Sequence, residues 1–322
     1  MTDTLSDVLR AVRLTGAVFF SVDASAPWVA EAPSATEVAP HIMPGVEHVI
    51  EYHVVTSGSC WGGLLDEPAI QLNAGDVLVF PHGDPHVMAS APGMRGHAGG
   101  GAPPVGLGRL PIAISLEGGG PERAHVICGF LGCDARPFNP LLAALPRVIH
   151  IRGTEDSVVL HRFVELALAE STTPRSGGEC MLARLSELLF VEVVRRYVAT
   201  LPAENVGWLA GLRDECVGRA LQSLHGRPAH AWTLEELAKE AGVSRSVLAE
   251  RFAVLVGVPP IQYLAKWRMQ LAASLLRSTK STLAEIAEQV GYGSEAALSR
   301  AFKRWLGVAP APYRRGDPRA RA

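Results

Sequence analysis

The last third of the 322-residue chain contains an internal repeat, and this repeat constrains the fold more than any other feature. Residues 234–243 read LEELAKEAGV and residues 283–292 read LAEIAEQVGY, an offset of 49. After the shared glycine the offset becomes 50, and it continues through a leucine, a phenylalanine, a glycine, a proline and a tyrosine. One extra residue in the second turn explains the change. A repeat of this length predicts one supersecondary unit built twice.

Each copy predicts two helices joined by a glycine-containing turn. Thr233 precedes the first helix of copy one and Glu236 follows three residues later, as in a capping box; Ser281 or Thr282 takes that place in copy two. A glycine ends each first helix, because only glycine enters the left-handed region without steric cost. A second helix with a serine cap follows. This is the helix-turn-helix pattern, whose second helix enters the DNA major groove.

The second helix of each copy has an apolar side and an outward side. The apolar residues are Leu248, Phe252 and Leu255 in copy one, and Leu298, Phe302 and Trp305 in copy two. The outward residues are Arg245, Ser246, Ala249, Glu250 and Ala253 in copy one, and Glu295, Ala296, Ser299, Arg300 and Lys303 in copy two. We therefore expect these outward residues to face DNA.

The outward side chains suggest different contacts with DNA. Arg300 and Lys303 can donate to guanine edges or to phosphates, and Arg245 can reach phosphate or base. Glu250 can accept a hydrogen bond from a cytosine amino group. The helix predicted between the copies, residues 261–278, is expected to hold the two units about one turn of DNA apart.

Residues 215–315 resemble the C-terminal domain of the AraC/XylS family of transcription regulators. The resemblance lies in WTLEELAKEAGVSRSVLAERF, GVPPIQYLAKWRMQLAASLL and IAEQVGYGSEAALSRAFKRWLGVAPAPYRR. It implies seven helices, binding of double-stranded DNA at two adjacent half-sites, and activation through RNA polymerase. Ala249, Ala253 and Ala296 are small where many members carry longer polar side chains. Apolar contact with thymine methyl groups is therefore expected to contribute to base recognition.

Charge and cysteine content agree with a polyanion-binding module attached to a different body. Residues 207–322 hold 17 lysines and arginines against 10 aspartates and glutamates, so the remainder is acidic. The five cysteines are irregularly spaced, which fits a reducing compartment rather than a disulfide framework. No run of 18 apolar residues and no signal-peptide pattern is present. We expect a cytoplasmic protein with no membrane partner.

The N-terminal part predicts an all-β domain, with apolar runs of strand length such as HVIEYHVV and HVICGF. The segment GDVLVFPHGDPH, residues 75–86, resembles the second sequence motif of the cupin jelly roll. The predicted fold is therefore α+β: a jelly-roll domain over residues 1–165, a helical connector over 166–206 and an all-α domain with two helix-turn-helix units over 207–322. The connector is expected to pair two subunits into a homodimer, as is common in this family.

The function of the jelly-roll domain stays open between three readings. The preferred reading is a small organic effector bound in a pocket lined by His53, Trp61, His86, Met88 and Cys128. The second is a metal site for Zn²⁺ built from His53, His82, His86 and Cys128, since the resemblance makes the His86 position a ligand in cupin enzymes. The third is thiol redox sensing through Cys60, Cys128 or Cys133, of which Cys60 is expected to be more exposed.

The first cupin motif is incomplete, and this decides against an enzyme. It normally offers two histidines one residue apart followed by a glutamate, whereas here His48 and His53 are five apart and only His53 shares a strand face with Glu51. The sequence requires no cofactor. It predicts a DNA-binding transcription regulator controlled by a small molecule or a redox signal; the alternative is a metal-dependent cupin enzyme with a helical appendage.

Overall fold

A computed structural model describes residues 3–96, 112–153, 158–172, 175–202 and 205–316. By internal contacts the chain divides into two compact units, each assembled from separate stretches. The strand-rich unit comprises Leu14–Cys133 and Leu145–Thr200. The helical unit comprises Met1–Arg13, Asp134–Ala144 and Leu201–Ala322. The helical unit therefore contains two segments from the first half of the chain.

The strand-rich unit is built around two long strands, β3 (His48–Leu64) and β8 (Arg123–Cys133), which pair antiparallel over ten residue pairs. The described strands are β1 (Thr15–Ser25), β2 (Val29–Ala32), β3 (His48–Leu64), β4 (Ile70–Asn73), β5 (Val77–Phe80), β6 (His86–Ala89), β7 (Ile112–Glu117), β8 (Arg123–Cys133) and β9 (Ile149–Ile151). They form one nine-stranded sheet with the central order β2-β6-β3-β8-β1-β7. The predicted strand-rich, cupin-like half is confirmed.

β3 makes this sheet curl, because its two halves pair with different strands. Glu51 to Val54 pair with β5, whereas Trp61 to Leu64 pair with β6. A bulge lies between Val55 and Ser57 opposite β8, and such a bulge bends the strand and shifts the alternation of its side chains. Interior residues are therefore odd-numbered before the bulge and even-numbered after it, as with Val49 and Cys60 in the buried core.

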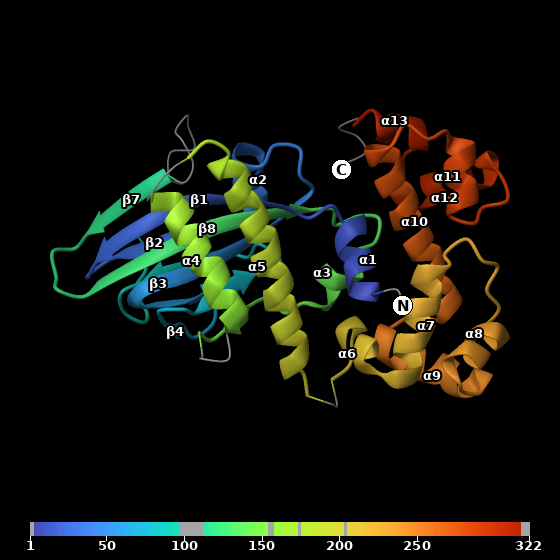
Figure 1. Ribbon diagram of the computed structural model, residues 1–322, viewed down its shortest axis with the longest axis horizontal. Helices are drawn as coiled ribbons and strands as arrows, with labels where there is room; N and C mark the ends of the chain where they lie inside the picture. Colours follow the sequence, from blue (N-terminus) through green and yellow to red (C-terminus); the bar gives the residue numbers. More distant parts are fainter. Residues whose placement is uncertain (1–2, 97–111, 154–157, 173–174, 203–204, 317–322) are drawn as a thin grey trace. The chain divides into compact units, whose positions relative to one another are not determined.

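Three described helices belong to the strand-rich unit: α2 (Ala35–Ile42), α4 (Val158–Thr172) and α5 (Gly178–Thr200). Figure 1 shows α4 and α5 side by side along one face of the sheet. Gly16 of β1 lets α5 approach closely, since a Cβ atom there would lie 2.3 Å from the carbonyl oxygen of Ala183. The hydroxyl groups of Tyr52 and Ser186 are 2.6 Å apart and fix α5 on the sheet.

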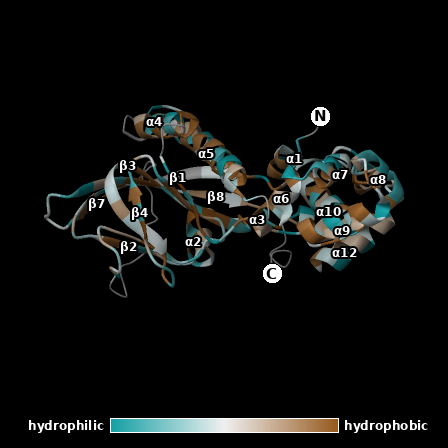
Figure 2. Cartoon of the chain, turned by 90° about the horizontal axis from the view of Figure 1, so that it is seen from below, coloured by the Kyte–Doolittle hydropathy of each residue, from teal (hydrophilic) through white to brown (hydrophobic). Residues whose placement is uncertain are grey.

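The helical unit contains the predicted repeat. Its described helices are α1 (Thr4–Ala11), α3 (Pro140–Ala144), α6 (Trp208–Arg213), α7 (Glu215–Gly226), α8 (Leu234–Ala241), α9 (Arg245–Val256), α10 (Pro260–Ser278), α11 (Leu283–Gln289), α12 (Glu295–Leu306) and α13 (Pro310–Arg314). In Figure 2, hydrophilic and hydrophobic residues lie side by side around α8, α9 and α12, as expected for amphipathic helices.

The caps form as the sequence predicts. Thr233 and Glu236 form a capping box at α8, and Thr282 with Glu285 forms the second at α11. Gly242 lies in the left-handed region with φ 75°, and Gly291 with φ 79°. The second helices start at serine caps three residues after Gly291 but two after Gly242. The extra residue therefore lies in the second turn, as predicted.

The two copies also repeat their core packing. Phe252 of α9 meets Tyr263 edge-on at 5.7 Å between ring centroids, and Phe302 of α12 meets Tyr313 in the same way at 5.1 Å. Trp305, which we predict in the apolar stripe, is 41% exposed instead. The stripe continues from Phe302 to Leu306, four residues on, and Leu306 packs on the core. The prediction for Trp305 was wrong because either spacing, three or four, continues a helical stripe.

Within the described residues, no single helix has the length and apolar composition of a membrane span. Taken together, α9 and α10 reach that length and apolar composition, but the two helices are bent by 52° relative to each other.

Candidate nucleic-acid interface

α9 turns a mixed face away from its core. Leu248 and Phe252 are fully buried beneath the helix, so the opposite side is exposed. The Oγ atom of Ser244 accepts a hydrogen bond from the backbone of Val247 and starts the helix. Of the residues predicted to face DNA, Arg245, Ser246, Glu250 and Ala253 are exposed and Ala249 is half-buried.

α12 turns a more basic face outward. Glu295, Ala296, Arg300 and Lys303 are exposed and Ser299 is half-buried. Arg304, on the same side, is exposed as well. In the described part of the chain no ion pair is formed by Arg300, Lys303 or Arg304. This helix therefore presents three free cations to a polyanion.

The charge of α9 is partly neutralised from a neighbouring helix. Arg251 forms an ion pair with Asp214, with a distance of 2.6 Å between Nη2 and Oδ2. Asp214 also caps α7, accepting from the backbone N–H groups of Cys216 and Val217 at 3.1 and 2.9 Å. Arg245 is left as the free cation of α9 in the described residues, next to the acidic Glu250. Of the two helices, α12 therefore presents the larger excess of positive charge.

A buried aromatic cluster supports α9 from below. The indole N–H of Trp208 donates to the Tyr263 hydroxyl at 2.8 Å, and His225 Nε2 lies 2.8 Å from the same oxygen. The His225 ring stacks on Trp267 with centroids 4.1 Å apart. Burial lowers the pKa of His225 to about 3, so the ring is neutral near pH 7. The cluster joins α6, α7 and α10 without a buried charge.

The interior of the strand-rich unit holds a second polar feature, a chain of three side chains. Nε2 of His53 lies 2.7 Å from Nε2 of His86, and Nδ1 of His53 lies 3.0 Å from Sγ of Cys128. Nδ1 of His86 lies 2.9 Å from the carbonyl oxygen of Asp84, so this nitrogen must be the donor. His86 Nε2 is then the acceptor for His53, and His53 Nδ1 accepts from the Cys128 thiol. Each of these hydrogen bonds therefore has one donor and one acceptor when His53, His86 and Cys128 are all neutral.

Glu51 lies beside this polar chain. Its Oε2 atom is 3.8 Å from Nε2 of His86, and its Oε1 atom is buried with no hydrogen-bond partner among the described residues. Burial raises the pKa of Glu51 to about 8. Burial also lowers the pKa of His86 to about 4. At neutral pH the site therefore holds a protonated acid and neutral imidazoles rather than an ion pair.

The structure brings together only part of the predicted pocket. His53, His86 and Cys128 meet as described, and Met88 lies in the same buried core. Trp61 does not, because the bulge in β3 turns Cys60 inward and leaves Trp61 on the other side of the strand, half-buried. Cys60, predicted to be more exposed, is only 1% exposed for the same reason.

Comparison with known proteins finds a matching protein family for each half of the chain. A family model described as Cupin matches residues 3–199, and one described as a helix-turn-helix domain matches residues 237–316. A putative AraC-like transcription regulator of Streptomyces lividans is 34% identical over 97% of this chain and 98% of its own length. A second one, from Streptomyces antibioticus, is 33% identical over 97% and 98%.

The chain belongs to the AraC-like transcription regulators. Among solved structures, the C-terminal domain of AraT, a response regulator from Geobacillus stearothermophilus, is 39% identical. It covers 32% of this chain and 85% of its own, with a TM-score of 0.31. The AraC-like regulator thus carries a DNA-binding domain in its helical unit and a cupin-type domain in its strand-rich unit, and it binds double-stranded DNA.

The residues of the cupin-type domain do not fit the metal that a cupin fold implies. The two imidazole nitrogens that would face an ion are bonded to each other at 2.7 Å. His82, predicted as a ligand, is bonded through Nε2 to the carbonyl oxygen of Leu145 instead. Within the described residues no group of three or more histidine, cysteine or acidic side chains is arranged to hold an ion. The predicted zinc set is therefore not assembled.

The cysteines of the cupin-type domain are protected rather than activated. Burial raises the pKa of Cys60 to about 12 and also raises that of Cys128 well above its ordinary value. Because the thiolate is the reactive form, both thiols are poor nucleophiles near neutral pH. Cys133 is buried as well. These surroundings favour the effector reading over the redox reading.

Sequence reasoning missed three exposed residues on the outward sides of α9 and α12. Val247 and Val254 of α9 are 45% and 60% exposed, and Arg304 of α12 is exposed at the position matching Val254. The signal was available, since Val254 and Arg304 follow the predicted Glu250 and Arg300 by four residues on the same helix side. Exposed valines on α9 add to the apolar surface offered by its alanines.

Replacing Arg300 by alanine tests the assignment of the α12 face. We expect a loss of about 1–3 kcal/mol in binding to the operator, concentrated at one base pair, if Arg300 donates to guanine. Competition binding on single-base operator variants measures this loss. Arg123→Ala, an exposed change at the start of β8, is the control. An equal loss on every DNA sequence, with a salt slope reduced by about 1, would instead mark a phosphate contact.

Replacing Glu51 by glutamine is expected to remove a loss of stability that occurs as the pH rises toward 8. The folded state keeps a proton on Glu51, whose pKa is about 8, that the unfolded chain has released. Stability from this group is therefore present at low pH and is lost as pH rises through the folded-state pKa. The loss between pH 6.5 and 8.5 is about 2 kcal/mol. Hydrogen exchange of β3 and β8 amides measures it; parallel pH profiles of both proteins contradict the assignment.

Proposed function

We propose that this regulator reads specific DNA sequences by placing α9 and α12 in two consecutive major grooves. The observation that carries the proposal is the duplicated packing: each second helix buries the same leucine and phenylalanine and exposes the opposite side. Two units of similar structure that share the helix between them suit two half-sites about one helical turn apart. Arg300, Lys303 and Arg245 would contact guanine or phosphate.

The remaining outward residues would add specificity. Glu250 would accept from a cytosine amino group. The small residues Ala249, Ala253 and Ala296, with Val247 and Val254 beside them, would meet thymine methyl groups. Ser246, Ser299 and Glu295 would complete the polar contacts. Because α12 carries more free charge, its half-site would dominate the salt dependence of binding.

Selection of genomic DNA fragments by the purified protein at physiological salt tests this proposal. We expect one motif with two half-sites about 10–10.5 base pairs apart, centre to centre. Recovery without any motif, together with binding that disappears on a modest increase in salt, would indicate nonspecific electrostatic attraction instead.

We further propose that a small organic effector in the cupin-type domain controls DNA binding. The polar chain of His53, His86 and Cys128 offers the hydrogen bonds that would orient such a ligand among apolar neighbours. Chain connectivity supports a route to the DNA-binding domain. Arg13 and Asp134 directly precede and follow the stretch from β1 to β8, and both belong to the helical unit.

Asp134 contacts the helix that joins the helix-turn-helix units, and Arg13 binds Asp134. Asp134 accepts from Arg13 at 2.7 and 2.6 Å and from Arg277 of α10 at 2.8 Å. Gln270 of α10, fully buried, donates to the carbonyl oxygen of Ala11 and accepts from the backbone of Phe138. A ligand that shifts β1 or β8 would therefore change the position of the residues that contact α10.

A thermal-shift screen of small molecules followed by operator binding tests effector control. We expect a stabilising compound to change operator affinity, and His86→Ala to abolish this response while the affinity without compound stays as in the wild type. A response that survives in a folded His86→Ala protein contradicts the assigned pocket.

We also propose that the regulator is not an enzyme, that it activates transcription with RNA polymerase, and that it works in the cytoplasm beside chromosomal DNA. The resemblance to the family and the regulators among its relatives support these points. In vitro transcription from a selected operator tests activation. Oxygen consumption without DNA binding would favour the cupin-enzyme alternative.

A homodimer is proposed from exposed apolar residues on two neighbouring helices. Val159 and Leu166 of α4 are 47% and 55% exposed, and Met181 and Leu188 of α5 are 53% and 49% exposed. Each pair is seven residues apart and so lies on one side of its helix. A second copy of the chain would cover these side chains, because an isologous contact brings the same patch from both partners.

Charge placed on this patch is expected to separate the subunits. Leu166→Glu and Leu188→Glu should convert a dimer into a monomer, since each buries an unpaired carboxylate in the contact. Analytical ultracentrifugation measures the species present. Val206→Glu, at a position 69% exposed outside α4 and α5, is the matched control and should leave the dimer intact. Monomeric wild-type protein would rule the proposal out.

A further inference from the structure

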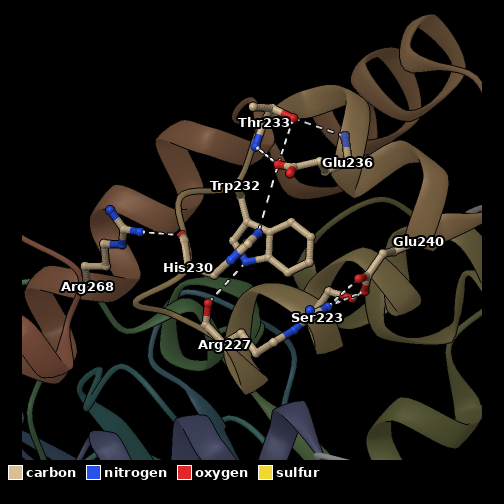
Figure 3. A network of polar contacts seen from close by, with 8 residues as sticks. All are labelled: Ser223, Arg227, His230, Trp232, Thr233, Glu236, Glu240 and Arg268. Atoms are coloured by element: carbon tan, nitrogen blue, oxygen red, sulfur yellow. Dashed lines mark hydrogen bonds and ion pairs between the residues drawn. The ribbon is translucent and has the colours of Figure 1, made fainter.

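The loop between α7 and α8, residues 227–232, is held by several side-chain contacts. Arg227 pairs with Glu240 at 2.5 Å and lies over the Trp232 ring at 4.5 Å from its centroid. The indole N–H of Trp232 donates back to the Arg227 carbonyl oxygen at 3.1 Å. Ser223 donates to Glu240 at 2.8 Å. Figure 3 shows these side chains converging on the loop. The loop is therefore held in one shape.

Arg268 ties this loop to α10. Its Nε atom donates to the carbonyl oxygen of Pro228 at 2.7 Å, and its Nη2 atom donates to that of His230 at 2.8 Å. The second of these contacts is drawn in Figure 3. A planar guanidinium presents two separated N–H donors at fixed positions, whereas the donors of a lysine share one nitrogen on a flexible stem. The loop of the first helix-turn-helix unit is thus fixed to the helix shared by both units.

The same loop abuts the turn of the second unit. Gly291, in the turn between α11 and α12, has no side chain, and a Cβ atom there would lie 2.7 Å from both Cα and the carbonyl oxygen of Ala229. It would also lie 2.9 Å from Nη2 of Arg268. The matching glycine of the first unit, Gly242, would meet only the end of the flexible Arg219 side chain, at 3.3 Å. The two turns therefore differ in this contact.

We infer that the α7–α8 loop is a spacer that fixes the distance between the two recognition helices, so that Arg268 and Gly291 determine which half-site spacing the regulator accepts. Two units packed on opposite ends of one helix can still shift relative to each other when that helix bends. A second contact away from the helix, here between Ala229 and Gly291, removes that freedom. The inference rests on the proposed reading of two half-sites, and it assigns spacing specificity to residues that touch no base.

Operators with the selected spacing and with one base pair added or removed test the inference. Wild-type protein is expected to bind the altered spacings about ten-fold more weakly, comparable to a mismatched base pair. Gly291→Ala, which pushes the loop away, and Arg268→Lys, which replaces two separated donor nitrogens by one, are expected to reduce this ratio toward one. The readout is the ratio of affinities, so a general loss of affinity does not affect it.

Two controls separate the contact from backbone strain. Gly242→Ala and Gly307→Ala impose the same left-handed strain, at φ 75° and 76°, without meeting the loop. Both should keep the wild-type ratio. The inference is overturned if folded Arg268→Lys keeps the wild-type ratio, or if Gly242→Ala relaxes it as much as Gly291→Ala. Wild-type protein that selects no motif at all would instead refute the proposed function.

Discussion

The structure depends on one helix that belongs to two cores at once. α10 contributes Tyr263 and Trp267 to the first helix-turn-helix unit and Met269 and Leu276 to the second, all four being at most 2% exposed. A helix that is buried along both ends cannot move relative to either unit without opening a core, which costs several kcal/mol for each large side chain exposed. The spacing of α9 and α12 is therefore set by packing and not by a linker.

Much of this arrangement could be predicted because its causes are local. The capping box of Thr233 and Glu236 acts on the start of its own helix, and Gly242 and Gly291 act on the turns that follow their own helices. The local sequence was therefore enough to predict these helix ends. The exposure of Trp305 could not be predicted in this way, since Phe302 can be followed on the stripe at a spacing of three or four. The bonds from Arg13 and from Arg277 of α10 to Asp134 could not be predicted either, because hydrogen bonds between residues more than a hundred positions apart leave no periodic signal.

In the interior of the cupin-type domain, too, local features could be predicted and contacts between distant strands could not. Strand alternation correctly predicted that Glu51 and His53 share a face. One bulge in β3 reversed the prediction for Cys60 and Trp61, because a shift of one residue exchanges the two sides of a strand. The pairing of His53 with His86 in place of a metal, and the bond from His82 to Leu145, depend on side-chain contacts between strands that the sequence does not specify.

Guanine methylation interference on a selected operator tests the central claim most directly, because N7 of guanine lies in the major groove. The account predicts two clusters of interfering guanines on one side of the duplex, about one helical turn apart. It also predicts stronger interference in the half-site bound by α12, which carries the free cations. A single cluster, or interference spread evenly along the site, would contradict the account.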